Sequence, residues 1–409
     1  MIQNKNLHYG WFIVLAGMLC IFGCIGLGRF ALGMLLPAMG ISLNLSYSQM
    51  GLISTSNFIG YLLSVLLCGH LAARFGSRQL IFAALLLSGI SMMLISTTSN
   101  LYAIILLYLL TGMGSGASNV PMMGLVSQWF VNKHRGKAAG LIVSGSGFAI
   151  LLSGKLIPFL NQLSDYGWRL SWFSLGVVVV VIAVICVLIL RNSPKEFGLL
   201  PVGTQKIAGN SIISNNTPIS TEHNSLPKII YHCAAIYFLF GYTYVIYATF
   251  IVTTMVQERG FSEDTAGDLW SWVGVLSLLS GPVFGTLSDR LGRKTGLIIV
   301  FFIQTIAYLL VALNLPDAFL YLSIGCYGVV AWSIPTIMTA LVGDYAGPGK
   351  AVKVLGFVTF IFAIGQIVGP YLAGLLAEAS GSFSSSFLMS AIMTGIAVLL
   401  SVLLKEKLS

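Results

Sequence analysis

The feature that most constrains this chain is a series of apolar stretches, each long enough to cross a lipid bilayer. A membrane-spanning helix needs roughly 20 apolar residues. Stretches such as 175–190 lack the period-two alternation of a barrel strand, and only 8% of the residues are charged, against about a quarter in soluble proteins. The chain is therefore expected to be an all-α membrane protein with twelve spans: 10–39, 46–72, 78–97, 101–127, 137–160, 168–190, 228–256, 262–287, 292–313, 316–342, 350–377 and 382–404.

The spans fall into two groups of six. Residues 1–190 are expected to form an N-terminal six-helix bundle and residues 228–409 a C-terminal one, and the polar stretch 191–227, rich in Asn, Ser, Thr and Pro, a cytoplasmic linker. An internal repeat supports this division, because GHLAARFGSR from Gly69 and GTLSDRLGRK from Gly285 occupy corresponding loops 216 residues apart. Two parallel repeats with a substrate site between them is a standard transporter plan.

The basic residues indicate orientation, because Lys and Arg are retained in cytoplasmic loops. With the N-terminus inside, the outer loops hold only Arg169 and Arg259. Both termini are therefore expected to be cytoplasmic. The net charge of +9 is concentrated at span ends and not along one basic face, so nucleic acid is not an expected partner.

The repeated loop carries a specific motif. Its second copy reads G-x-L-x-D-R-x-G-R-K, and its first copy has alanine at the acidic position, Ala73. The pattern resembles that of the major facilitator superfamily, and the resemblance covers essentially the whole chain. It implies twelve helices in two pseudo-repeats that rock about a central site. It also implies a gate between the halves on the cytoplasmic side, made by Gly69, Arg74, Gly76, Arg78, Gly285, Asp289, Arg290, Gly292 and Arg293.

Three segments resemble the oxalate/formate and monocarboxylate transporter branch of that superfamily: HYGWFIV, WFVNKHRGKAAG and RNSPKEFGLLPVG. The stretch GRFALGMLLPAM resembles uncharacterised bacterial members. The resemblance implies a multi-pass protein of the bacterial inner membrane. A lysine that the oxalate branch carries deep in the eleventh span is absent here, since Lys353 stands at the start of that span.

Three ionisable residues, Arg29, Lys155 and Asp268, lie inside apolar spans, where a charge is costly unless it faces a cavity or a partner. Counted from the cytoplasmic span ends, they are expected at nearly one level, roughly 27 to 29 Å deep. The resemblance places the first helix at the central cavity, so Arg29 is the candidate cation for a carboxylate or phosphate group. The alternatives are that Arg29 snorkels or pairs with Asp268.

The resemblance also implies that the fifth and eighth helices face each other across the halves. Lys155 and Asp268 are therefore candidates for an ion pair that closes an outer gate. Asp268 is also the candidate proton-coupling group, because a desolvated carboxylate can exchange protons near neutral pH. The alternatives are that Lys155 reaches the outer interface, and that Asp268 is favoured by the dipole at a helix N-terminus.

Polar and aromatic residues on the cavity-lining spans and on the eleventh span complete the predicted substrate site. Tyrosine and tryptophan supply apolar walls with hydrogen-bonding tips, and buried amides either bind a ligand or join helices. The candidates are Asn119, Tyr244, Tyr247, Tyr327, Trp332 and Gln366.

No nucleotide loop, metal cluster or nucleophile–base pair stands out, so neither an enzyme nor a cofactor or metal is expected. The sequence favours a monomeric secondary transporter in the lipid bilayer that moves a small, monocarboxylate-like organic anion by alternating access, coupled to protons. Two alternatives remain at this point. One is proton-driven efflux of hydrophobic cations or drugs, and the other is a substrate-sensing receptor on a transporter scaffold.

Overall fold

The computed structural model describes residues 8–164, 166–204, 228–313, 315–346 and 350–404. Within them, twelve helical spans are long and apolar enough to cross a membrane, as predicted, with boundaries that differ by a few residues. Most of the predicted linker, 205–227, lies outside the described residues. The first six spans are α1–η1–α2 (Gly10–Leu43), α3 (Tyr47–Phe75), α4 (Ser77–Ile95), α5 (Leu101–Trp129), α6 (Asn132–Asn161) and α7 (Gly167–Ile189). The second six are α8–η3 (Lys228–Glu258), α9 (Glu263–Leu291), α10 (Arg293–Ala312), α11–α12 (Ala318–Ala346), α13 (Ala351–Ser380) and α14 (Ser384–Val402).

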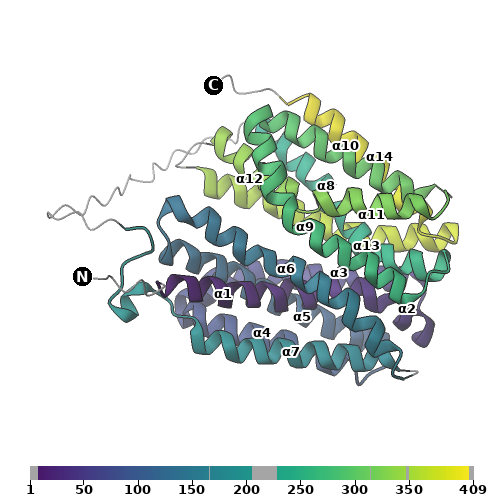
Figure 1. Ribbon diagram of the computed structural model, residues 1–409, viewed down its shortest axis with the longest axis horizontal. Helices are drawn as coiled ribbons and strands as arrows, with labels where there is room; N and C mark the ends of the chain where they lie inside the picture. Colours follow the sequence, from purple (N-terminus) through teal and green to yellow (C-terminus); the bar gives the residue numbers. More distant parts are fainter. Residues whose placement is uncertain (1–7, 165, 205–227, 314, 347–349, 405–409) are drawn as a thin grey trace, which may run out of the picture.

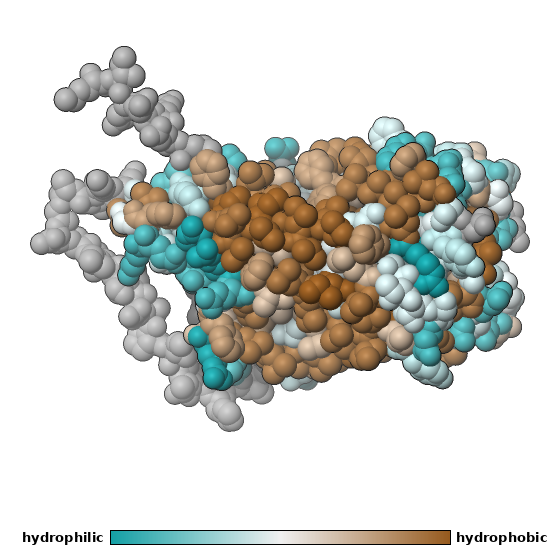
Figure 2. Space-filling view, turned by 90° about the horizontal axis from the view of Figure 1, so that it is seen from below, coloured by the Kyte–Doolittle hydropathy of each residue, from teal (hydrophilic) through white to brown (hydrophobic). Residues whose placement is uncertain are grey.

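The helices form two bundles that lie one above the other in Figure 1, α1 to α7 in one and α8 to α14 in the other. Helix α1 begins and α14 ends on the same side of the molecule, which we call the terminal side. The opposite side, where α2 ends at Leu43 and α6 at Asn161, is the far side. Hydrophobic residues form a broad belt between these two sides, and hydrophilic residues gather at both of its edges (Figure 2). This is the surface expected of a protein that spans a bilayer.

Glycines let the two bundles meet backbone to backbone in their far halves. A Cβ added at Gly154 of α6 would lie 2.4 Å from the carbonyl oxygen of Gly267 in α9. The same addition at Gly51 of α3 would lie 2.4 Å from the carbonyl oxygen of Pro370 in α13. Both distances are far below van der Waals contact, so only glycine permits these approaches.

The bundles separate toward the terminal side, as Figure 1 shows. Gly147 and Gly154 of α6 both meet α9, whereas Gly136 and Gly140, nearer the start of α6, face open space. The protein is therefore closed on the far side, and its bundles diverge toward the terminal side.

Two central spans depart from regular α-helix. In the first span, η1 (Phe22–Phe30) is a π-helix, a form that is rare and frequent at functional sites. The tenth span is interrupted between α11 and α12, where the amide of Trp332 donates to Ser280 Oγ at 2.8 Å. These irregular segments set the direction of Arg29 and Trp332.

Candidate functional site

Arg29 lies at the end of the π-helix, in the middle of the molecule, and only 8% of it is exposed. It stands 14 residues from the far end of its span at Leu43. Among the described residues, it is the only Asp, Glu, Lys or Arg more than two turns from the end of a membrane span. A fully charged guanidinium at this depth requires compensation from its surroundings.

The first bundle holds the guanidinium from one side. Arg29 Nε donates to Asn57 Oδ1 at 3.4 Å, and the group lies over the rings of Phe58 and Tyr61, 4.5 and 4.4 Å from their centroids. All three partners belong to α3. Asn119 of α5 donates to the Tyr61 hydroxyl at 2.8 Å, which fixes that ring beneath the cation.

The second bundle approaches from the other side. The Tyr244 hydroxyl of α8 interacts with Arg29 and accepts a hydrogen bond from Gln366 Nε2 of α13. Trp332 packs its ring against Phe30 at 5.1 Å and against Tyr244 at 6.0 Å between centroids. Arg29, Asn119, Tyr244, Trp332 and Gln366 are thus brought together, and they join the two bundles at one point.

The guanidinium is incompletely satisfied. Arg29 Nη2 is buried and has no hydrogen-bond partner within the described residues, and no carboxylate in that part of the chain forms an ion pair with it. A small cavity of about 10 Å³, roughly the space of one water molecule, adjoins the group and is lined by Ser54, Tyr108 and Thr249 among others. The guanidinium can therefore compensate a negative charge, and the space beside it in this conformation holds about one water molecule.

Tyr247 and Tyr327 occupy a different place from the other candidates. Their rings stack at 4.0 Å inside the second bundle, and both are buried. Tyr247 is bonded to Ser323 Oγ at 2.8 Å, and the Tyr327 hydroxyl donates to the Tyr244 carbonyl at 3.1 Å. Their present contacts pack the bundle and support Tyr244, and substrate contact by them stays a prediction.

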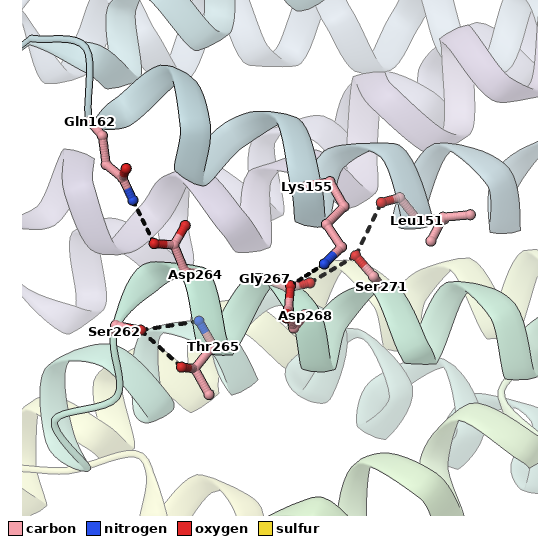
Figure 3. Close-up of polar contacts among 9 residues, drawn as sticks. All are labelled: Leu151, Lys155, Gln162, Ser262, Asp264, Thr265, Gly267, Asp268 and Ser271. Carbon is pink, nitrogen blue, oxygen red and sulfur yellow. Dashed lines mark hydrogen bonds and ion pairs between the residues drawn. The ribbon is translucent and has the colours of Figure 1, made fainter.

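Lys155 and Asp268 form the expected ion pair between α6 and α9, drawn in Figure 3. Their predicted depth is wrong. Lys155 lies six residues from the far end of α6 and Asp268 five from the far end of α9, about 9 and 8 Å. Counted from the terminal side, Lys155 and Asp268 each stand 23 residues along their spans and Arg29 stands 19, because α6 begins at Asn132 and α9 ends at Leu291. The pair is also exposed, with 61% of the Lys155 side chain and 58% of the Asp268 side chain accessible. Arg29 does not form the alternative ion pair with Asp268.

Further polar contacts close the far side around this pair. Asn161 and Gln162 of the first bundle donate to Glu263 and Asp264 of the second at 2.8 and 2.7 Å, and Figure 3 shows the Gln162–Asp264 bond. Elsewhere on this side, Glu378 accepts bonds from Ser46 Oγ and the Ser48 amide at 2.8 and 2.9 Å. In each contact a carboxylate of the second bundle accepts from an uncharged donor of the first. We call these contacts, together with the Lys155–Asp268 pair, the far-side latch.

The two copies of the loop motif bind within their own bundles. In the first copy, the Arg78 amide donates to Asn192 and its Nε to the Val187 carbonyl at 2.8 Å. In the second copy, Arg293 pairs with Asp289 and, at 3.4 Å, with Asp344 near the end of α12.

Three glycines of the motif have structural roles. Gly76 and Gly292 end α3 and α9 at φ of +81° and +92°, which glycine adopts without strain, and Gly285 lies against Thr336. Gly69 faces open space, and Arg74 lies over the neighbouring Phe75 ring at 5.3 Å. The exposed Arg290 ends α9. A gate between the halves at this motif stays a prediction.

Sequence reasoning did not single out Asn57, Phe58 and Tyr61, which hold the guanidinium. The signal was present, because an amide and a tyrosine four residues apart on one apolar helix lie on the same face. The resemblance places the first, fourth, seventh and tenth helices at the cavity, so it does not predict ligands on the second span.

Comparison with known proteins supports a transporter. Residues 21–402 match the family described as "Uncharacterised MFS-type transporter YbfB". The chain is similar to the hexuronate transporter of Bacillus subtilis, 24% identical with 94% of this chain and 90% of the relative covered. It also resembles the probable sulfoacetate transporter SauU of Cupriavidus necator, 22% identical with 90% and 88% covered, and the quinolone resistance transporter of Acinetobacter baumannii, 23% with 87% and 84%.

A solved structure shares the fold. It is the bacterial homolog to the human lysosomal transporter Spinster in an inward-facing and occupied conformation. The superposition has a TM-score of 0.77 with 14% sequence identity, over 98% of this chain and 97% of that one.

Proposed function

Because this chain belongs to the major facilitator superfamily of transporters, we propose that the small molecule it carries across the membrane is an organic anion bound by Arg29. The observation that carries this proposal is the buried guanidinium, whose Nη2 has no hydrogen-bond partner and which pairs with no carboxylate among the described residues. A buried cation of this kind selects an anionic ligand, since the ligand restores the compensation that the protein lacks. The named substrates of two relatives, hexuronate and sulfoacetate, are organic anions and support the same class.

We further propose that transport proceeds by alternating access about Arg29. The cluster around Arg29 contains groups from both bundles. The binding of an anion there would therefore depend on the relative position of the two bundles. The bundles would reopen on the far side by breaking the far-side latch and separating the glycine contacts at Gly154 and Gly267. The two bundles would then meet on the terminal side and close it.

The orientation and the coupling belong to the same proposal. We place the terminal side, with both termini, in the cytoplasm of a bacterium and the far side outside the inner membrane, because the basic residues concentrate on the terminal side. We propose a monomer, and coupling to protons through Asp268. Asp268 is not desolvated in this conformation, where 58% of its side chain is exposed beside Lys155, so this part of the proposal rests on its place in the far-side latch.

Uptake by proteoliposomes tests the substrate class. Lactate, formate, oxalate, an aromatic acid and a lipophilic cation would each be offered with and without an inward proton gradient. Uptake of at least one acid should occur and fall at least tenfold in Arg29→Gln and in Arg29→Lys, because lysine keeps the charge and loses the fork of donors. Cation flux that depends on Asp268, with no flux of any acid, would replace this function with drug efflux. Ligand binding without flux would indicate a receptor.

A further inference from the structure

Two residues that contact Tyr244 come from different bundles, and each buries a hydrogen-bond donor that has no partner within the described residues. One is Arg29 Nη2 and the other is the indole Nε1 of Trp332. Both residues interact with Tyr244, Arg29 through its hydroxyl and Trp332 through its ring at 6.0 Å. Both also stand on irregular segments, the π-helix of the first span and the break in the tenth. We call Arg29 Nη2 and Trp332 Nε1 the donor pair.

Other tryptophans of this protein also have an unpartnered indole N–H, so the surroundings of Trp332 are what point to a ligand. Trp168 and Trp270 also bury an Nε1 atom without a partner. Both of those side chains are almost wholly buried, whereas Trp332 is half-buried beside the only deep cation among the described residues. A buried donor without a hydrogen bond is unfavourable by about 1 to 3 kcal/mol. A ligand that accepts from both members of the donor pair would relieve two such deficits at once.

The aromatic rings next to the donor pair indicate the shape of the uncharged part of that ligand. Four rings, Tyr237, Phe240 and Tyr244 of α8 with Phe362 of α13, lie nearly parallel, at interplanar angles of 3° to 16°. We call this group the aromatic stack. Tyr244 joins it to the donor pair, and Phe362 is half-buried while the other three rings are buried. Flat unsaturated groups bind to such surfaces more favourably than hydroxylated ones.

The charge of the ligand follows from the count of cations at this depth. Among the described residues, every other Lys and Arg lies within two turns of a helix end or in a loop. The neighbouring amides are also engaged, Asn119 with Tyr61 and Gln366 with Tyr244. The site therefore compensates one negative charge and offers few free groups to a polyhydroxylated substrate.

We propose that the donor pair clamps the single carboxylate or sulfonate of a flat, unsaturated or aromatic monoanion, and that the ligand body stacks on the aromatic stack. This inference rests on the proposed function and specifies its substrate class. Because one donor belongs to each bundle, the bound anion would also hold the bundles together at this level.

Binding to the purified full chain tests the inference, by calorimetry with a panel of acids that differ in one property each. Benzoate and benzenesulfonate should bind, cyclohexanecarboxylate and glucuronate should bind at least tenfold more weakly, and neutral benzamide and the dianion terephthalate should bind at least tenfold more weakly. Trp332→Phe keeps the ring and removes the N–H, and it should weaken benzoate binding about tenfold. Trp270→Phe removes an equally unpartnered N–H outside the cluster and should leave the affinity unchanged.

The outcomes separate this inference from the function beneath it. If glucuronate or lactate binds in an Arg29-dependent manner, benzoate binds no better, and Trp332→Phe is silent, the donor pair and the aromatic preference are wrong while anion transport stands. If no acid binds, and if uptake into proteoliposomes is the same in Arg29→Lys and Arg29→Gln as in the parent protein, the proposed function fails as well. Circular dichroism and size-exclusion profiles matching the parent protein would show that each variant is folded.

Discussion

The Lys155 ammonium and the Asp268 carboxylate join α6 to α9 as an ion pair, yet 61% and 58% of the two side chains remain exposed. An exposed pair of this kind contributes about 0 to 1 kcal/mol. It lies in the far-side latch, where neutral donors of the first bundle meet Glu263, Asp264 and Glu378 of the second. The closed far side is thus held by several weak contacts and by the close backbone approaches of Gly154 to Gly267 and of Gly51 to Pro370, which we call the glycine seam. Weak contacts of this kind suit the repeated opening that the proposed alternating access requires.

The ion pair predicts a modest and coupled effect on the gate. Lys155→Ala and Asp268→Ala should each raise far-side opening about two- to fivefold. The double variant should open no more than either single variant, because both substitutions remove the same ion pair. Opening would be measured as the rate at which an impermeant maleimide labels Ser54→Cys. Ser54 is buried beneath the gate and bonded to Thr249 of the other bundle at 3.2 Å.

Exchanging the two charges is the control, because Lys155→Asp combined with Asp268→Lys restores an attractive pair. Labelling should then return toward the parent rate. Additive effects of the two single variants would show that the residues act on the gate independently.

The glycine seam predicts a much larger effect. A Cβ at Gly267 would lie 2.1 Å from the Gly154 carbonyl oxygen, and backbone atoms cannot yield to it. Gly267→Val should prevent closure of the far side, raise labelling of Ser54→Cys and reduce transport at least tenfold. Gly140→Val on α6 faces open space and serves as the control. Normal transport by Gly267→Val would show that the far side need not close this tightly.

Much of this architecture could be predicted from the sequence, because membrane spans are defined by length and apolarity alone. The twelve spans and the contact of the fifth with the eighth agree with the structure. Arg29 could be selected as a site residue because a charge within an apolar span is rare.

The sequence could not supply the depths or the true neighbours. Equal residue counts from approximate span ends placed Lys155 level with Arg29, and the start of α6 at Asn132 removes that equality. Helical spacing alone also could not separate Tyr244, which faces Arg29, from Tyr247, which faces Ser323. Three residues turn a helix by about 300°, so small errors in rotation exchange a cavity face for a core face.

The distribution of basic residues predicts the orientation. A fluorescent protein fused after Ser409 should fluoresce in bacterial cells, because both termini are expected in the cytoplasm. Alkaline phosphatase fused after Ser164, at the far end of the first bundle, should be active, because that enzyme folds only outside the cytoplasm. Active phosphatase at the C-terminus with an inactive fusion after Ser164 would reverse the orientation.

The unpartnered guanidinium predicts a conflict between stability and function. Within the described residues, the Arg29 guanidinium is contacted by Asn57, by the rings of Phe58 and Tyr61, and by Tyr244, and by no carboxylate. Replacing a buried ion pair with apolar residues of similar volume is often neutral or stabilising by about 1 to 4 kcal/mol, and an unpaired buried charge has the desolvation cost without the attraction of a partner. Arg29→Met should therefore unfold at a higher temperature than the parent when no ligand is present, while anion binding is abolished.

A thermal unfolding series measures both effects together. Saturating anion should raise the unfolding temperature of the parent, since a ligand that binds only the native state stabilises it, and should leave Arg29→Met unchanged. Leu32→Met, a nearby substitution of one buried apolar side chain by another, is the matched control and should respond to the anion as the parent does. If Arg29→Met is less stable than the ligand-free parent, the contacts with Asn57, Phe58 and Tyr61 already compensate the charge. Arg29 would then be a structural residue, and the anion site would have to be sought elsewhere.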